Sequence, residues 1–483
     1  MALAAPGRTL AEVLAEALAS DPGIRLLATD EQSAEASQLL AASAFDSELR
    51  ASAGWQQVKK PLVASGTSTT ESWQSELGWQ RLLRSGLSIE PALSLSRQDA
   101  ASSGATTESR LAVALRQPLL AGRRQPTATV AERGAALELS AARRELLQGV
   151  AERLAGVASR YWELAAAEQS LAILRAAEER SGTLLATVKR QVEADLTPRA
   201  ELIQLAANQV AKQADTIAGE RELYAARERL ALAVGAAAWP ARELAAGDEL
   251  PTGSPELPEA GSGELPARQG WLRRGDLLAA EDRREAAALQ VAAAEDALKP
   301  RLDLLFTPSW NGLAVGSSAG DFFAAAYRDL PGPSASLSLS FTRPLGNLEA
   351  RSQLLAAQAG LARAEIREEL LRRSIASATA IALDAVRRDA EEVARAAEAV
   401  SLFSQAAENE EKKLKAGTST VIDVITQRDR AAGAQLRLVG ARLTLALARV
   451  ELRLALGAFV VATPRGPALE RVELGPLLRG GAP

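Results

Sequence analysis

ARERLALAVG, the stretch at residues 226–235, returns as ARVELRLALG at residues 448–457, and six of the ten positions are identical. The register holds backward without a gap, so that Ala194 corresponds to Ala416 at the same offset. In each half of the chain, a strand-like segment and a very long helical pattern precede this stretch. The sequence therefore predicts a duplicated unit of strand, long helix, turn and long helix.

The duplication divides the 483 residues into two repeats joined by a linker that is rich in proline, glycine and glutamate. We expect the first repeat at residues 1–238, the linker at 239–270, the second repeat at 271–460 and a C-terminal tail at 461–483. Only 4% of the residues are aromatic, and much of the apolar content is alanine. Because alanine favours helix and lets helices approach closely, this composition indicates long, thin helical layers.

The composition also excludes several classes of function. A net charge of −4 argues against general binding of nucleic acid. The chain has no cysteine and no histidine, so it lacks disulfides, thiol chemistry, the commonest metal ligand and the commonest general base. No glycine-rich phosphate loop or cluster of metal ligands is visible. We therefore expect no enzyme, no catalytic residue, no metal and no cofactor.

Two helical patterns are far longer than the helices of ordinary globular proteins. They run through residues of about 125–235 and 348–457, and a short turn interrupts each one. A further helix is expected near the N-terminus, where Thr9 and Glu12 form a capping-box pattern and Pro22 introduces a break. None of these stretches has the roughly 18 uncharged apolar residues of a membrane helix.

Small apolar residues recur every seven positions along the second hairpin, which is the pattern of a coiled-coil seam. Because the two helices are adjacent in sequence, we expect an antiparallel hairpin whose two seams face one another. The outgoing helix carries Val386, Val393, Val400, Ala407 and Leu414, and the returning helix carries Ile425, Ala432, Val439 and Ala446, joined by Leu436, Leu443 and Val450.

Apolar and polar residues alternate in the segments before each long helix, at about 46–118 and 300–345. Such alternation is typical of transmembrane β-strands, and only a closed barrel satisfies every backbone group in lipid. One chain has too few strands to close a wide barrel, so a barrel implies several copies. A small sheet packed on the helices is the alternative. The side chains expected to face lipid are Leu111, Val113, Leu115, Leu337, Leu339 and Phe341.

Several short motifs occur along the chain in a fixed order: Thr9–Leu18 with Asp21-Pro22, Gln117–Leu120, Tyr161–Ala166, Arg343–Asn347, and Ala416–Val424 leading into Gln427. With the duplication, they resemble the TolC family of outer-membrane efflux and secretion channels over nearly the whole chain. The resemblance implies a mainly α fold with a membrane β-barrel portion. Three protomers would each give about four strands to a shared barrel, continued by an antiparallel coiled-coil α-barrel across the periplasm.

The resemblance also assigns the two turns between long helices to the periplasmic entrance, where an adaptor docks. These turns correspond to Ala194, Asp195 and Leu196 with Glu201, and to Ala416, Gly417 and Thr418 with Asp423. Asp195 replaces a glycine of the pattern, which is tolerable because aspartate accepts the left-handed turn conformation. Ser419 and Thr426 stand where some members have the arginine and aspartate of a closed gate, so a salt-bridged gate of that kind is not expected.

A second departure from the family lies at Glu71–Arg97, which adds two strand-like segments to the basic pair. These segments either extend the barrel strands or form a separate outer hairpin. Asp423 also has two interpretations. Three copies around a narrow mouth would form an acidic ring with Glu201 and favour cations. Alternatively, Asp423 supports the N-terminus of the returning helix, where a carboxylate is favourable.

The leading hypothesis is a passive homotrimeric duct in the outer membrane, with its helices in the periplasm. It would be the exit of a tripartite efflux pump or type I secretion system, opened by a periplasmic adaptor and driven by an inner-membrane transporter. The alternative is a soluble or periplasmic coiled-coil scaffold, which explains the heptads but not the alternating strands. Met1–Leu10 is too short and too weakly apolar for the h-region of a secretory signal, and no dedicated pocket specifies the cargo.

Overall fold

The computed structural model describes residues 7–61, 67–100, 104–123, 127–193, 199–235, 244–252, 274–315, 332–416, 418–463 and 466–469. The chain divides into two compact units. The helical unit contains Met1–Glu31, Ala142–Ala279 and Glu369–Pro483. The strand unit contains Gln32–Ala141 and Ala280–Glu368. Each unit therefore draws on both halves of the sequence.

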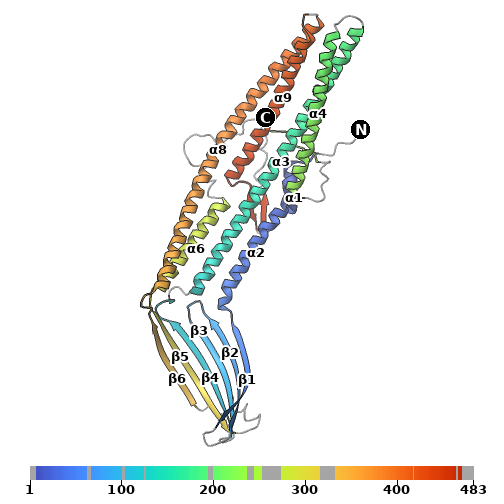
Figure 1. Ribbon diagram of the computed structural model, residues 1–483. Helices are drawn as coiled ribbons and strands as arrows, with labels where there is room; N and C mark the ends of the chain where they lie inside the picture. The colour runs from blue at the N-terminus through green and yellow to red at the C-terminus, as the bar shows by residue number, and fades with distance from the viewer. Residues whose placement is uncertain are drawn as a thin grey trace. The chain divides into compact units, whose positions relative to one another are not determined.

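The strand unit is built on one antiparallel sheet in which every strand pairs with its neighbours in chain order (Figure 1). Among the described strands, the first and the last pair on one side only, so they are the edges of the sheet. The six strands are β1 (Glu48–Pro61), β2 (Thr67–Leu82), β3 (Ser88–Ala100), β4 (Gly104–Pro118), β5 (Arg301–Val315) and β6 (Gly332–Thr342).

The alternation of the sequence gives the sheet one apolar and one polar face, because directly opposed residues of paired strands lie on the same side. One row of opposed residues crosses all six strands as Ala51, Leu77, Leu93, Leu111, Trp310 and Pro333. The adjacent row, on the other face, is Ser52, Glu76, Ser94, Arg110, Asn311 and Gly332. All six side chains predicted to face lipid lie on the apolar face.

The strand count corrects the expectation of about four strands, since the sheet has six. The two additional strands are β2 and β3, which contain the segment Glu71–Arg97 singled out in the sequence. A tight turn joins them, with the Leu83 N–H 2.8 Å from the Leu87 oxygen and Gly86 at a φ of 84°. Because β2 and β3 pair between β1 and β4, this segment extends the sheet and is not a separate hairpin.

The long helices lie where the sequence periodicity predicts them. In the helical unit, α3 with α4 and α8 with α9 are successive helices that run alongside one another (Figure 1). A short hairpin of β7 (Val460–Thr463) and β8 (Gly466–Leu469) follows the last helix. The helices are α1 (Leu10–Ser20), α2 (Pro22–Ala42), α3 (Thr127–Glu193), α4 (Arg199–Val234), α6 (Gly275–Ala297), α8 (Leu348–Lys415) and α9 (Val421–Ala455).

Helix ends confirm the sequence signals. Thr9 caps α1 in a capping box with Glu12, as predicted, and Pro22 begins α2 after the predicted break. Gly235 and Gly457, which occupy equivalent places in the two repeats, have φ values of 70° and 65°. This left-handed conformation ends a helix at little cost only with glycine, so the duplicated stretch ends its helix in the same way twice.

The core of the helical unit shows that α9 has two neighbours. Val386 and Val393 of α8 are buried against Ala441 and Leu445 of α9, so the predicted seam of the outgoing helix is confirmed there. The prediction for the returning helix holds only in part: Ile425 packs in one cluster with Leu414 of α8. Val439, Ala446 and Val450 belong to a different cluster, with Leu154, Tyr161 and Leu230 of the first repeat. A helix with two neighbours buries two faces, and a single heptad stripe describes only one of them.

Candidate functional site

The turn between α8 and α9 is described by the structure except for residue 417. Ala416 and Thr418 are exposed there, after the last residue of α8. The Thr418 N–H lies 2.9 Å from the Lys413 oxygen, a bond that closes the last turn of a helix in the Schellman arrangement. In that arrangement the preceding residue is usually a left-handed glycine. Gly417 itself, like Ala194, Asp195 and Leu196 of the first turn, lies outside the described residues.

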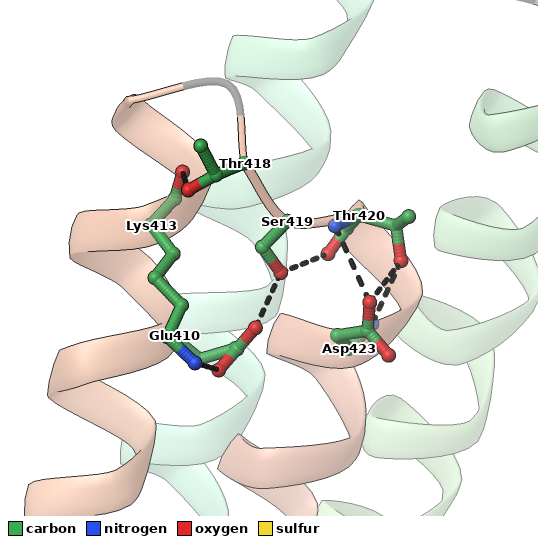
Figure 2. Close-up of polar contacts among 6 residues, drawn as sticks. All are labelled: Glu410, Lys413, Thr418, Ser419, Thr420 and Asp423. Carbon is green, nitrogen blue, oxygen red and sulfur yellow. Dashed lines mark hydrogen bonds and ion pairs between the residues drawn. The ribbon is translucent and has the colours of Figure 1, made fainter.

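Thr420 caps the returning helix in a capping box with Asp423, as Figure 2 shows. The Asp423 N–H lies 3.3 Å from the Thr420 hydroxyl oxygen, and the Thr420 hydroxyl lies 2.6 Å from the Asp423 carboxylate. The carboxylate also accepts from the Thr420 N–H at 3.3 Å. The hydrogen bond from the Thr420 side chain lowers the pKa of Asp423. Asp423 thus supports the N-terminus of the returning helix, as one of its two sequence interpretations predicts, whereas the N-cap Thr420 was missed despite the T-x-x-D pattern.

Ser419 contacts α8 at the position where some family members have an arginine. Its hydroxyl lies 2.5 Å from one carboxylate oxygen of Glu410, and the ammonium of Lys413 lies 3.0 Å from the other (Figure 2). The hydrogen bond from Ser419, together with Lys413, lowers the pKa of Glu410. Ser419 therefore connects the loop before α9 to the C-terminal end of α8 through a hydrogen bond.

A groove with a volume of about 730 Å³ lies beside this turn, between helices of both repeats. Its floor is apolar, with Val188 of α3 and Val421 and Val424 of α9 almost fully buried. Its rim carries hydroxyl and charged groups from all four long helices, including Thr183, Thr187, Glu201, Glu411, Thr420 and Arg428. The groove can thus hold an apolar side chain of a partner and offer polar contacts around it.

Polar contacts beside the groove join the two helices of the second hairpin to one another and to the first hairpin. The Arg428 guanidinium lies 2.7 Å from the Glu411 carboxylate, which links α9 to α8. The Lys212 ammonium of α4 lies 2.9 Å from the Asp429 carboxylate of α9, which links the first repeat to the second. The sequence analysis missed these four residues because charged residues on long helices are usually solvated, and their partners lie far away in sequence.

The predicted site residues are thus only partly brought together. Glu201 lines the groove, whereas Asp423 does not occur among its lining residues. Within the part of the chain that the structure describes, no group of three acidic residues is arranged to hold a metal ion. In the same residues, no helix is long and apolar enough to cross a membrane.

Residues 269–458 match the family model described as outer membrane efflux protein. This range nearly coincides with the expected second repeat, residues 271–460. No curated protein matches the sequence of the chain. Proteins of the matched family are channels and not enzymes, which agrees with the sequence interpretation.

Solved outer-membrane proteins share the fold along nearly the whole chain. CusC, which forms a transmembrane channel, aligns with a TM-score of 0.72 and 15% identity over 93% of this chain and 92% of its own. The outer-membrane channel MtrE of Neisseria gonorrhoeae aligns with a TM-score of 0.68 and 17% identity, over 93% and 88%. VceC, an outer membrane protein of Vibrio cholerae, aligns with a TM-score of 0.66 and 17% identity, over 93% and 96%.

The resemblance read from the sequence motifs, the family match over residues 269–458 and the fold shared with these channels agree. Residues 269–458 match the outer membrane efflux protein family, and the chain shares the fold of solved outer-membrane channels, as its motifs resembling the TolC family predict.

Proposed function

We propose that the protein is a passive homotrimeric exit duct of the outer membrane, serving a tripartite efflux pump or a type I secretion system. The observation that carries the proposal is the sheet with one continuous apolar face and two edges, β1 and β6. Its outward side chains are large and exposed, with Leu337 at 70% and Phe341 at 62%. An apolar face of this kind requires lipid, and the two edges require strands from other copies to close a barrel.

A soluble coiled-coil scaffold accounts for the long helices but gives no reason for this sheet. Exposed leucine and phenylalanine in a continuous row would cause a soluble protein to aggregate. In lipid the same row is favourable, since each apolar side chain is transferred out of water. The apolar face therefore favours the duct over the scaffold.

The turn beside the groove is the proposed docking place of a periplasmic adaptor. Ala416 and Thr418 are exposed, small and adjacent to the groove, so a partner helix can approach the backbone closely. Gly417 and the equivalent Ala194, Asp195 and Leu196 belong to the same proposed surface. The apolar floor at Val421 and Val424 would take the side chains of an adaptor hairpin, and an inner-membrane transporter would drive the cargo.

The proposed entrance also carries acidic residues. Glu201 lies on the rim of the groove, and Asp423 lies on the first turn of α9. In a trimer each carboxylate would occur three times around the mouth, and a constriction of one charge sign concentrates counter-ions. The capping role of Asp423 does not compete with this proposal, because a carboxylate that accepts hydrogen bonds stays ionised.

Reconstitution of the purified protein in a planar lipid bilayer tests the proposal. We expect stepwise conductance that persists without nucleotide or an ion gradient, since a passive duct needs neither. Adding a synthetic hairpin from a periplasmic adaptor should change the conductance of the wild type, and less so when Val421 is replaced by aspartate. Protein that stays soluble without detergent and gives no conductance steps would support the scaffold.

A further inference from the structure

We infer that the hairpin β2–β3 is an additional membrane-spanning part of the barrel wall, with its apolar face in contact with lipid acyl chains. The inference rests on the proposed trimeric duct. Three copies of a six-stranded sheet would then close a barrel of 18 strands. The four strands per protomer implied by the resemblance would instead close a barrel of 12.

Continuity of the apolar face is the first observation. Leu77 of β2 and Leu93 of β3 oppose one another, and they continue the row that runs through Leu111 of β4. On the opposite face, Glu76 and Ser94 continue the polar row. A hairpin standing in water outside the bilayer would have no reason to keep this alternation in step with its neighbours. The wall of a barrel requires it, because each strand meets lipid on one side and water on the other.

The turn of the hairpin is the second observation, because it is fixed at the end of the sheet where the helices begin. The Arg84 guanidinium lies 2.9 Å and 2.5 Å from the two carboxylate oxygens of Glu132 on α3. The Thr129 hydroxyl lies 3.2 Å from the Arg84 carbonyl oxygen. The guanidinium also lies 4.7 Å from the ring centroid of Phe45, just before β1. The hairpin therefore starts at the helical end of the sheet, level with the bases of α3 and β1.

The length of the hairpin is the third observation. Its shorter strand, β3, has 13 residues. At about 3.4 Å per residue and a tilt of about 40°, such a strand rises about 34 Å along the membrane normal. This exceeds the apolar band of about 25 Å that outer-membrane barrels present. β2 and β3 are thus long enough to cross the outer membrane completely.

An aromatic pair marks the hairpin as interfacial at its far end. Trp73 of β2 lies directly opposite Trp55 of β1, with ring centroids 6.3 Å apart. Both rings are about half exposed, at 53% and 54%. Beyond them, on the same face of β2 and β3, come the charged Glu71 and Asp99. In a membrane strand, tryptophan is enriched at the interface, and charged residues lie beyond it among the headgroups. The order of residues on β2 and β3 fits this pattern.

The consequence is a wider exit. With strands about 4.8 Å apart and tilted by about 40°, a closed barrel of 18 strands has a backbone radius of about 18 Å, against about 12 Å for 12 strands. The cross-section of the lumen roughly doubles. The outer-membrane part of this duct would therefore admit bulkier hydrated cargo than a barrel with four strands per protomer.

Single cysteines test the inference, since the chain has no cysteine of its own. Leu93→Cys and Ser94→Cys form a matched pair on β3, and Leu339→Cys and Ser338→Cys form a reference pair on β6. Each variant would be checked for the mass of the wild type, labelled with a nitroxide and reconstituted in liposomes. Collision with oxygen reports exposure to lipid, and collision with a neutral nickel chelate reports exposure to water.

We expect the labels at residues 93 and 339 to collide mainly with oxygen, and those at 94 and 338 mainly with nickel. If residue 93 collides with nickel while residue 339 still collides with oxygen, β3 lies outside the bilayer, and the inference fails while the proposed duct stands. If residues 93 and 339 both collide with nickel, the sheet is no membrane barrel, and both fail. Images of the wild-type assembly supply a second measure: a backbone diameter near 36 Å is expected, and one near 24 Å would overturn the wider barrel.

Discussion

The hydroxyl oxygen of Tyr161 lies 3.0 Å from the carboxylate of Asp248 and 2.9 Å from its backbone nitrogen. The same hydroxyl lies 2.9 Å from the carbonyl oxygen of Arg8, and the Leu10 N–H lies 2.7 Å from the Asp248 carboxylate. A single buried side chain of α3 thus holds the N-terminal segment and the described part of the linker, residues 244–252. Tyr161 belongs to one of the motifs that carry the family resemblance, and this network gives it a structural role.

Replacing Tyr161 by phenylalanine should destabilise the helical unit. The ring still fits, but the Asp248 N–H loses its acceptor inside the protein. Leaving a buried polar group without a partner costs about 1–3 kcal/mol. The midpoint of chemical unfolding, followed by the helical signal, measures the change. Tyr224→Phe is the matched control, because Tyr224 is 53% exposed and its removal should cost less than about 0.5 kcal/mol. Equal midpoints for the two variants would contradict the role of the network.

Tyr161 should also make stability depend on pH in the alkaline range. Burial, as the main cause, raises the pKa of Tyr161 above its usual range. In the unfolded chain the phenol ionises near pH 10, whereas in the folded protein it stays protonated to higher pH. The protonated Tyr161 phenol therefore contributes fully to the free energy of unfolding below about pH 10, and this contribution is lost as the pH rises further. Unfolding midpoints measured from pH 8 to 11 should fall more steeply for the wild type than for Tyr161→Phe.

Orientation of the sheet can be tested on β6, where apolar residues and serines alternate. Leu339→Arg should cost about 2–4 kcal/mol, because it places a charge on the face proposed to meet lipid near the bilayer midplane. Ser338→Arg should be mild, since that side chain would point into a water-filled lumen. The amount of assembled protein extracted from outer membranes compares the two variants. Equal amounts would mean that the assigned faces are wrong.

Asp423→Asn separates an entrance ring from a purely local cap. The asparagine oxygen can still accept from the Thr420 N–H, so the thermal midpoint of the assembly should change little. Removing three charges from the mouth should nevertheless reduce the preference for cations in single-channel recordings. Glu398→Gln, on an exposed face of α8, is the control and should leave selectivity unchanged. If Asp423→Asn lowers the midpoint but keeps the wild-type selectivity, the residue acts only as a cap.

Much of this fold could be predicted because the periodicity of apolar residues along the chain determines where strands and helices form. Period-two alternation predicted the strands and the shared face of Leu111 and Leu339, and Gly235 marked the end of its helix. The pairing order of strands is not encoded locally, however, so the sequence alone could not place Glu71–Arg97 within the sheet. The face of α9 that meets α8 was missed for a similar reason, since Val439 and Leu445 are equally apolar and only tertiary packing decides which neighbour each one meets.

The candidate site was less predictable than the fold. The T-x-x-D pattern of Thr420 and Asp423 is a visible capping signal that could have been used. The link between Lys212 and Asp429 joins residues from different repeats, and no spacing rule connects them. Contacts of this kind depend on how two hairpins pack, which a single sequence does not reveal.

We propose that this chain closes a membrane barrel only together with other copies of itself. The mass of the purified protein in mild detergent tests the claim most directly, after the mass of bound detergent has been subtracted. We expect one species with three times the 50.7 kDa mass of the chain, resistant to dilution, because the unpaired edges of β1 and β6 leave no stable monomer. A monodisperse monomer of 50.7 kDa would contradict the trimeric duct.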